Sequence, residues 1–302
     1  MNIFIKGTYL PIGHVEIRVH NHTPKTINFN GNAISFSAES GNISAIKKIE
    51  ISPEELDYVK DTEKTLPYNE QFEENLTNQY EDIRTIVKYI QAFDAVFNLD
   101  DDLSMKCFYE WSLDFVSWAP IPEKRKTSWK AFELRVVLPG NLLGQIERLA
   151  NKGIPVFSAF KHLYKAYGEP DPRFKWINGT IAAEHAFKEF LSLKDSRVES
   201  LMLHVPSPPV EKLYKNVLFA YTGQESSMYK QLQKGASKRN ELIHRPATKS
   251  PNLKETDIYL HQVEVAIFEL YTFLYPKDSF FEYSLKRAKE SILLGNPILS
   301  LS

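Results

Sequence analysis

The stretch KRNELIHRP, residues 238–246, is predicted to end a helix and to place several polar side chains in its last turn. Pro246 has no backbone N–H to donate, and it disfavours helical geometry at the preceding residue, Arg245. The helix is therefore expected to end near His244. Unsatisfied carbonyl groups and the negative end of the helix dipole gather there, and both favour a protonated imidazole. His244 is thus a candidate proton donor near neutral pH.

Arg239 lies in the same predicted helix, five residues before His244. On an ideal helix the two side chains point about 140° apart. They can converge only if the last turn is distorted or if the long guanidinium reaches around the helix. Asn240 directly follows the arginine and adds a small polar side chain to this turn.

The sequence around this motif is basic. Between Ser226 and Ser250 a single acid, Glu241, stands against these cations: Lys230, Lys234, Lys238, Arg239, Arg245 and Lys249. The first three lysines recur every four residues, which places them on one face of a helix. Arginine binds phosphate through two hydrogen bonds and lysine adds a point charge, so this face suits a phosphodiester. Histidine can move a proton to or from a ribose hydroxyl.

Helices are predicted for the whole second half of the chain. The hydrophobic period changes to 3.6 residues after Pro139-Gly140, and Gly or Pro residues bound each periodic segment. The predicted helices lie within LLGQIERLAN, PVFSAFKHLYKAYG, RFKWINGTIAAEHAFKEFLSL, VEKLYKNVLFAYTG, SSMYKQLQKGASKRNELIH and TDIYLHQVEVAIFELYTFLY. The Tyr/Phe stripe of the last segment is predicted to be core. We expect a domain boundary near 140–155, and hence an α-helical domain over residues 151–302.

The first part of the chain is predicted to be β-rich. Residues 15–19, VEIRV, alternate apolar and polar side chains as a half-buried strand does. INFNG and AISFS, which meet at Gly31-Asn32, indicate a hairpin. Further strands are predicted within SAIKKIEIS, MKCFYEWSLDFVSW and AFELRVVLP. A polar, acidic stretch runs to residue 78, and a helix is predicted over residues 79–98. The fold class is therefore α+β, with a β-rich domain over residues 1–150.

The length, composition and charge fit a globular protein of two domains. The chain has 302 residues, 43% of them hydrophobic and 25% charged, and domains usually span about 100–200 residues. A formal net charge of −1 argues against a wholly basic nucleic-acid binder but allows a local basic patch. The single cysteine, Cys107, excludes an intramolecular disulfide and a cysteine-rich zinc site. Because neither a signal peptide nor a membrane-length apolar run is found, we expect a cytoplasmic protein without membrane association.

The motif and the helices upstream of it resemble HEPN domains, helical bundles that include metal-independent ribonucleases. RNELIH matches the Rx4–6H motif of that family, and the polar Asn240 after the arginine fits the family habit. Residues 160–191 are similar to the opening helix pair of the larger, Apea-like HEPN proteins. The long helix of that pair has the form A-x-E-x-x-x-x-x-L, which three residues follow loosely: Ala182, Glu184 and Leu191. The resemblance covers roughly residues 155–295.

The resemblance implies a mechanism without a metal ion or other cofactor. HEPN nucleases act as dimers in which two copies of the motif face one cleft. Arg239 would hold the scissile phosphate and stabilise the charge that develops on it. His244 would act as general acid or base with the RNA 2′-hydroxyl as nucleophile, and Asn240 would orient the substrate or the histidine. Glu184 would position Arg239. RNA would also be bound by neighbouring cations: Lys230, Lys234, Lys238 and Arg245.

The resemblance also implies a biological setting. The protein would be an endoribonuclease of the toxin-like or antiviral kind, with RNA and a second copy of itself as partners. The N-terminal domain would sense a signal or hold the nuclease in check, and its sequence names no ligand.

Other interpretations of the same residues stay open. Arg239 and His244 can simply stabilise the end of a helix, by a few tenths of a kcal/mol. The lysine face can be an ordinary solvated surface, and Glu184 can be only an ion-pair partner. The helical domain can also bind RNA or a nucleotide without cleaving it, or serve only for dimerisation.

Residues that can bind metals also occur outside the motif, but their spacing favours other roles. His14 and His20 lie about 20 Å apart along one extended strand, too far to share an ion. His261 and Glu264 form an H-x-x-E pair on a helix with no second metal motif, and we predict that both lie at the surface. Cys107 falls in an apolar, aromatic strand and is predicted to be buried.

Overall fold

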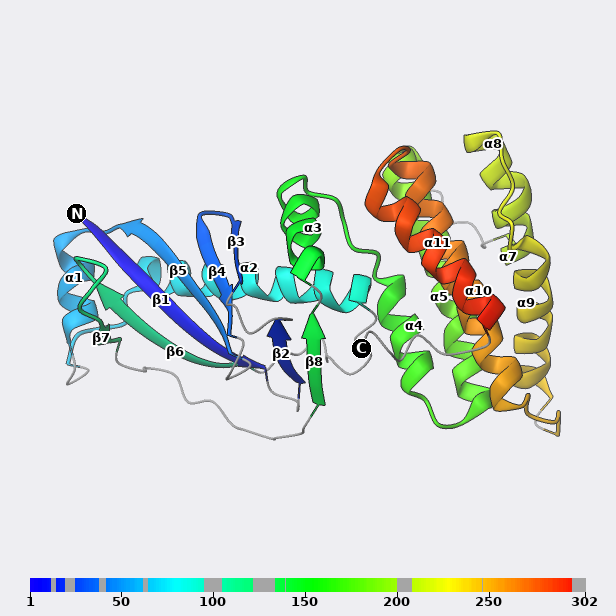
Figure 1. Ribbon diagram of the computed structural model, residues 1–302, viewed down its shortest axis with the longest axis horizontal. Helices are drawn as coiled ribbons and strands as arrows, with labels where there is room; N and C mark the ends of the chain where they lie inside the picture. Colours follow the sequence, from blue (N-terminus) through cyan, green and yellow to red (C-terminus); the bar gives the residue numbers. More distant parts are fainter. Residues whose placement is uncertain are drawn as a thin grey trace. The chain divides into compact units, whose positions relative to one another are not determined.

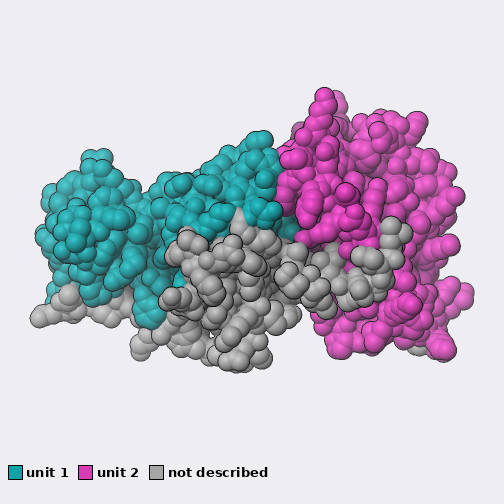
Figure 2. Space-filling model, viewed as in Figure 1, with its two compact units in different colours: residues 1–155 teal, residues 156–302 magenta. Residues whose placement is uncertain are grey.

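The computed structural model of the protein (Figure 1) describes residues 1–11, 15–19, 25–37, 42–61, 65–94, 105–121, 134–138, 140–199, 208–245 and 247–294. The chain divides into two compact units, residues 1–155 and residues 156–302 (Figure 2). Unit 1 combines a sheet with helices, and unit 2 is helical in its described residues. The α+β class predicted from the sequence is therefore confirmed.

An antiparallel sheet of six strands forms the framework of unit 1. Its strand order is β3-β4-β5-β1-β6-β7, with β1 at Asn2–Pro11, β3 at Lys25–Phe29, β4 at Asn32–Phe36, β5 at Ile43–Glu50, β6 at Met105–Ser112 and β7 at Ala119–Pro120. A separate parallel pair joins β2 (Val15–Val19) to β8 (Leu134–Leu138). In β1, Ile3, Ile5 and Tyr9 are buried, because alternate side chains of a strand face the same side of the sheet.

The β3–β4 hairpin turns at Asn30-Gly31, one residue earlier than predicted. Both residues have positive φ, 49° and 77°, as a two-residue type I′ turn requires. Asn30 also donates through Nδ2 to Asp82 Oδ1 at 2.6 Å. Because Asn-Gly and Gly-Asn are both turn signals, the sequence indicated the hairpin without deciding between the two positions.

The helices of unit 1 are α1 (Pro53–Lys60), α2 (Glu70–Asp94) and α3 (Gly140–Asn151). The prediction that a helix starts at residue 79 is wrong, because α2 begins nine residues earlier. Phe72 and Leu76 are buried in its first turns. The acidic residues around them hid the helical period, so the stretch was interpreted as a polar connection. Helix α1 was not predicted, although Ser52 and Glu55 form a capping box at its start.

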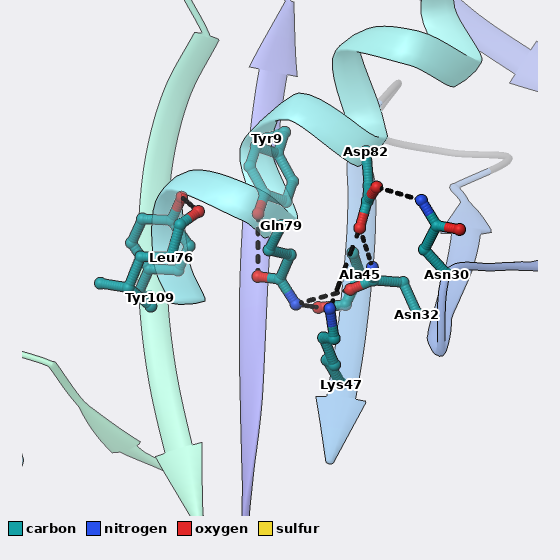
Figure 3. A network of polar contacts seen from close by, with 9 residues as sticks. All are labelled: Tyr9, Asn30, Asn32, Ala45, Lys47, Leu76, Gln79, Asp82 and Tyr109. Carbon is teal, nitrogen blue, oxygen red and sulfur yellow. Dashed lines mark hydrogen bonds and ion pairs between the residues drawn. The ribbon is translucent and has the colours of Figure 1, made fainter. Parts of the chain in front are cut away.

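A buried polar network holds α2 against the sheet (Figure 3). Tyr9 Oη donates to Gln79 Oε1 at 2.8 Å, and Gln79 Nε2 donates to Asn32 Oδ1 at 3.1 Å. Asn32 Nδ2 in turn donates to Asp82 Oδ2 at 2.8 Å. A Cβ atom at Gly7 would lie 2.4 Å from Tyr9 Oη, so only glycine leaves room for the network. Because its members come from β1, β4 and α2, the network fixes how the helix lies on the sheet.

Unit 2 is a bundle of helices in which α10 contacts α4, α5, α9 and α11. The described elements are α4 (Ala159–Gly168), α5 (Pro172–Lys194), α7 (Val210–Lys212), η1 (Leu213–Val217, a π-helical turn), α8 (Leu218–Thr222), α9 (Tyr229–His244), α10 (Leu253–Leu274) and α11 (Ser279–Leu294). Figure 1 shows α5, α9, α10 and α11 running alongside one another. Helix α10 is buried without a break from Val263 to Tyr271, so its aromatic stripe is core, as predicted.

The prediction that His261 and Glu264 lie at the surface is wrong, because each side chain is only 3% exposed. Tyr167 Oη lies 2.9 Å from His261 Nδ1 and donates to Glu264 Oε2 at 3.2 Å. Burial, assisted by the Glu264 carboxylate, raises the pKa of Tyr167 well above its ordinary value. The physical reason is the position of α10: its neighbours surround it, so even its polar positions face other helices.

The other structural predictions are only partly covered by the described residues. His14 and His20 lie outside them, and so does the side chain of Cys107, whose backbone pairs with Tyr9 in the β1–β6 register. In the part of the chain that the structure describes, no helix combines the length and the apolarity that crossing a membrane requires.

Candidate functional site

Helix α9 carries the predicted motif and stays regular to its end. It runs from Tyr229 to His244. Beyond it, the amide of Arg245 donates to the carbonyl of Glu241 at 2.9 Å, the ordinary hydrogen bond of an α-helix. The last turn is therefore not distorted, and one of the two routes by which Arg239 and His244 could converge is not taken.

Arg239 lies on the face of α9 that packs into unit 2. Leu232, Gly235 and Leu242 share that face and are buried. The Nε atom of Arg239 is buried and has no hydrogen-bond partner among the described residues. Its Nη1 atom donates to Asn240 Oδ1 at 3.2 Å. The structure thus brings together two of the three predicted catalytic side chains, and it buries the inner edge of the guanidinium.

His244 is the last residue of α9, and its side chain is exposed. A regular helix keeps it about 140° from Arg239 around the helix axis. Within one chain, therefore, the structure does not bring the predicted proton donor and the predicted phosphate-binding arginine to the same face of the helix.

The predicted RNA-binding cations follow the outer side of α9. Lys230 and Lys234 are exposed, and so is Arg245 at the C-cap of the helix. Lys238 is only 29% exposed, and its Nζ lies 3.8 Å from Glu241 Oε2. This pair partly neutralises one charge of the lysine face. Lys230, Lys234 and Arg245 are still exposed around the helix, so the face keeps a local positive potential.

Glu184, predicted to position Arg239, is half-buried on α5. In the described residues no ion pair joins it to Arg239. Both charges act instead on Tyr259 of α10. Burial raises the pKa of Tyr259 well above its ordinary value; the Glu184 carboxylate raises it further, whereas the Arg239 guanidinium opposes the rise. The two predicted residues are therefore neighbours of the same tyrosine rather than direct partners.

An aromatic cluster that the sequence did not reveal joins α9 to α5 and α10. The Tyr259 ring stacks on Trp176, with centroids 4.3 Å apart and planes 11° apart. The Tyr259 hydroxyl lies 2.9 Å from Thr180 Oγ1, and Trp176 Nε1 donates to the carbonyl of Gly235 at 3.0 Å. Gly235 is the only local signal for this cluster, because a glycine inside a helix often marks a close approach of neighbouring atoms. It lies one helical turn before Arg239.

Arg173 is a second arginine at the end of α9 that the sequence analysis missed. It lies in the first turn of α5, and its Nη2 atom donates to the carbonyl of Leu242. This hydrogen bond satisfies one of the carbonyls left without an intrahelical partner in the last turn of α9, and it adds positive charge close to His244.

Among the described residues, no group of three or more His, Cys, Asp or Glu side chains is arranged to hold a metal ion. Comparison of the chain with protein-family models, with curated proteins and with solved structures gives no match. A function must therefore be inferred from the residues of α9 and of the helices packed around it.

Proposed function

We propose that unit 2 is a HEPN-type bundle and that the protein is a metal-independent endoribonuclease with Arg239, Asn240 and His244 as its catalytic residues. The end of α9 carries this proposal. There Arg239 is half-buried and hydrogen-bonded to Asn240, while His244 is exposed as the last helical residue. One helix end thus offers a cation for a phosphate and a group that can transfer protons near neutral pH.

The reaction needs a base and an acid. The ribose 2′-oxygen attacks the adjacent phosphorus and loses its proton, the bond to the 5′-oxygen breaks, and that oxygen takes up a proton. The products are a 2′,3′-cyclic phosphate and a free 5′-hydroxyl. Arg239 stabilises the negative charge on the non-bridging oxygens during this transfer. His244 serves as the base or as the acid in this transfer, and a water molecule takes the other role.

The divergence of Arg239 and His244 within one chain supports a site built from two copies of the protein. Because the last turn of α9 is regular, His244 points away from the Arg239 of its own chain. It is exposed and available to a phosphate held by another copy. A homodimer formed through unit 2 would in this way complete a site that one chain leaves open.

RNA is the substrate class that the surrounding charges favour. Lys230, Lys234 and Arg245 are exposed around α9, and each can neutralise a backbone phosphate on either side of the cleaved bond. Unit 1 would sense a trigger or restrain the nuclease, as in a toxin-like or antiviral defence effector acting in the cytoplasm.

The test is a cleavage assay in EDTA with end-labelled structured RNAs, tRNA included. Wild type should yield fragments ending in 2′,3′-cyclic phosphate, and His244→Ala should lower the rate by about 10²-fold or more. Lys249→Ala, which removes an exposed cation nearby, is the matched control and should cleave at nearly the wild-type rate. Fragments ending in 3′-hydroxyl, or equal rates for wild type and His244→Ala, would contradict the proposal.

A mixing experiment tests whether the site spans two chains. Arg239→Ala and His244→Ala should each cleave at least about 10²-fold more slowly than wild type when tested alone. If Arg239 of one copy works with His244 of the other, a mixed dimer contains one intact site and one doubly defective site. After free exchange of an equal mixture, half of the dimers are mixed and each has one intact site of its two, so about a quarter of the wild-type activity should return. No recovery, with exchange of subunits shown independently, would place each site within a single chain.

A second candidate function is RNA binding without cleavage. It is favoured by the same divergence, because His244 does not share the face of α9 on which Arg239 lies. In this case wild type binds RNA but cuts none, and Arg239→Ala weakens binding. A purely structural dimerisation role predicts instead that Lys238→Ala and His244→Ala change neither the RNA affinity nor its salt dependence.

A further inference from the structure

Gly235 lies where α9 approaches the ring of Tyr259 most closely. A Cβ atom at this position would lie 2.2 Å from ring atoms of Tyr259, a distance that no real side chain tolerates. The carbonyl of Gly235 accepts a hydrogen bond from Trp176 Nε1 at 3.0 Å. At this turn, therefore, the backbone of α9 packs directly against Tyr259 and Trp176.

Tyr259 itself is held from two further sides. Its ring stacks on Trp176 with planes only 11° apart, its hydroxyl lies 2.9 Å from Thr180 Oγ1, and only 2% of the residue is exposed. Stacking on Trp176 limits tilting of the ring, and the contact between the hydroxyl and Thr180 limits sliding of the ring within its own plane. The ring is thus a rigid surface formed by α5 and α10.

Arg239 follows Gly235 by one helical turn and lies on the same face of α9. Side chains four residues apart on a helix are neighbours, with Cβ atoms about 5–6 Å apart. The guanidinium is close enough to oppose the rise in the pKa of Tyr259. Its Nε atom is buried without a hydrogen-bond partner in the described residues.

We propose that Tyr259 is the positioning residue of Arg239, and that the glycine at 235 exists to let the ring reach its place. The ring forms the surface against which the inner edge of the guanidinium packs, which directs the Nη atoms outward. The consequence for catalysis rests on the proposed ribonuclease function, whereas the positioning itself does not.

Two glycine substitutions separate positioning from general packing. Gly235→Ala forces the Tyr259 ring to move. Gly179→Ala is the matched control: it also lies in a helix of unit 2, and its Cβ would lie 2.4 Å from Leu260 Cδ2 but 3.7 Å from the Tyr259 ring. Both variants crowd the interface with α10, and only the first displaces the ring. Should Gly235→Ala fail to fold, Tyr259→Phe keeps the ring and removes its contact with Thr180.

In the cleavage assay, Gly235→Ala should lower kcat by about 10²-fold, because misplacing a catalytic group by about 1 Å has that effect. Tyr259→Phe should lower kcat in the same direction by less, and Gly179→Ala should leave it unchanged. In an Arg239→Ala background, Gly235→Ala should cost nothing further. Equal losses in both glycine variants, or an undiminished loss in that background, would overturn the proposal.

A readout independent of activity keeps the two proposals apart. In ¹H–¹⁵N NMR spectra, the Nε–H of Arg239 should exchange slowly with water in wild type and in Gly179→Ala, and faster in Gly235→Ala or Tyr259→Phe. If this pattern holds but wild type cuts no RNA, the ribonuclease function fails and the positioning stands. If the Nε–H of Arg239 in wild type exchanges as fast as that of exposed Arg245, the positioning is refuted whatever the activity.

Discussion

Replacing Gly7 by alanine should destabilise unit 1, because the new methyl group enters the buried polar network. The Cβ atom would lie 2.4 Å from Tyr9 Oη, 2.6 Å from Tyr9 Cε2 and 2.6 Å from Gln79 Oε1. These distances are all shorter than van der Waals contact. Neither partner can stay where it is, and the 2.8 Å hydrogen bond between them must lengthen or break.

Three terms give the size of the effect. Crowding a packed interior costs about 1–3 kcal/mol. Leaving a buried acceptor such as Gln79 Oε1 without its donor costs about 1–3 kcal/mol more. The unfolded alanine chain has less backbone freedom than the glycine chain, which returns about 0.5–1 kcal/mol. The free energy of unfolding of unit 1 should therefore fall by roughly 1–5 kcal/mol.

Amide hydrogen exchange is the suitable assay, because two units in one chain make a single global unfolding transition ambiguous. Protection should fall in β1 and β5, while α10 in the other unit serves as an internal reference. Gly144→Ala is the matched control. It lies in α3 with nothing within 4 Å of its Cβ, so alanine should raise the stability of the same unit by about 0.5–1 kcal/mol.

The reasoning is refuted if Gly7→Ala leaves the protection of β1 unchanged, or if it shifts stability in the same direction as Gly144→Ala. A further check uses Tyr9→Phe, which removes the hydroxyl nearest to the new methyl group. Because both changes act on one contact, their effects should be less than additive. Full additivity would show that the methyl group disturbs something other than the Tyr9–Gln79 pair.

Three further perturbations follow from the structure. Burial lowers the pKa of His162, and a neighbouring histidine lowers it further. The unfolded chain therefore binds this proton at a higher pH than the folded chain does, so unit 2 should lose stability as pH falls below about 6.5. His162→Gln should flatten this pH dependence, which denaturation at pH 5 and at pH 7.5 would measure. Replacing both Lys230 and Lys234 by glutamine should reduce the log–log salt slope of single-stranded RNA binding by roughly 1.4; an unchanged slope would exclude this face. Glu269 is 5% exposed and accepts a hydrogen bond from Ser226 Oγ at 2.6 Å. Glu269→Leu should therefore destabilise the start of α9 by about 1–3 kcal/mol. Unaltered amide hydrogen exchange at the start of α9 would contradict this prediction.

Local patterns in the sequence account for the elements that pack along one clear stripe. The helices of unit 2 predicted from 3.6-residue periods and Gly or Pro boundaries lie at the predicted segments, but α11 (Ser279–Leu294) was not among them. The start of α2 was missed because two buried apolar residues, Phe72 and Leu76, stand alone among acids there. His261 and Glu264 were misplaced for a related reason: a helix surrounded on all sides has no outer face, and its sequence does not show how many neighbours it has.

In the candidate site, too, local sequence patterns predicted some features and not others. Pro246 and the helical period predicted where α9 ends and how far apart Arg239 and His244 point, because both depend on backbone geometry alone. The bonds from Arg173 to Leu242 and from Trp176 to Gly235 span 69 and 59 residues of chain. Such contacts follow from how the helices pack, and no local pattern encodes them.

The regular end of α9 separates the direction of Arg239 from the position of His244, although both residues belong to one short motif. Under the proposed positioning, the direction of Arg239 is set inside unit 2, by Gly235 and the ring of Tyr259. The position of His244 relative to a bound phosphate depends on what faces the exposed end of the helix. Under the proposed function, a single chain should bind a phosphate without being able to cleave its ester. Dilution should then lower the cleavage rate per chain as copies separate, while the RNA affinity of each chain persists. Arg239→Ala should remove both properties, and His244→Ala only cleavage.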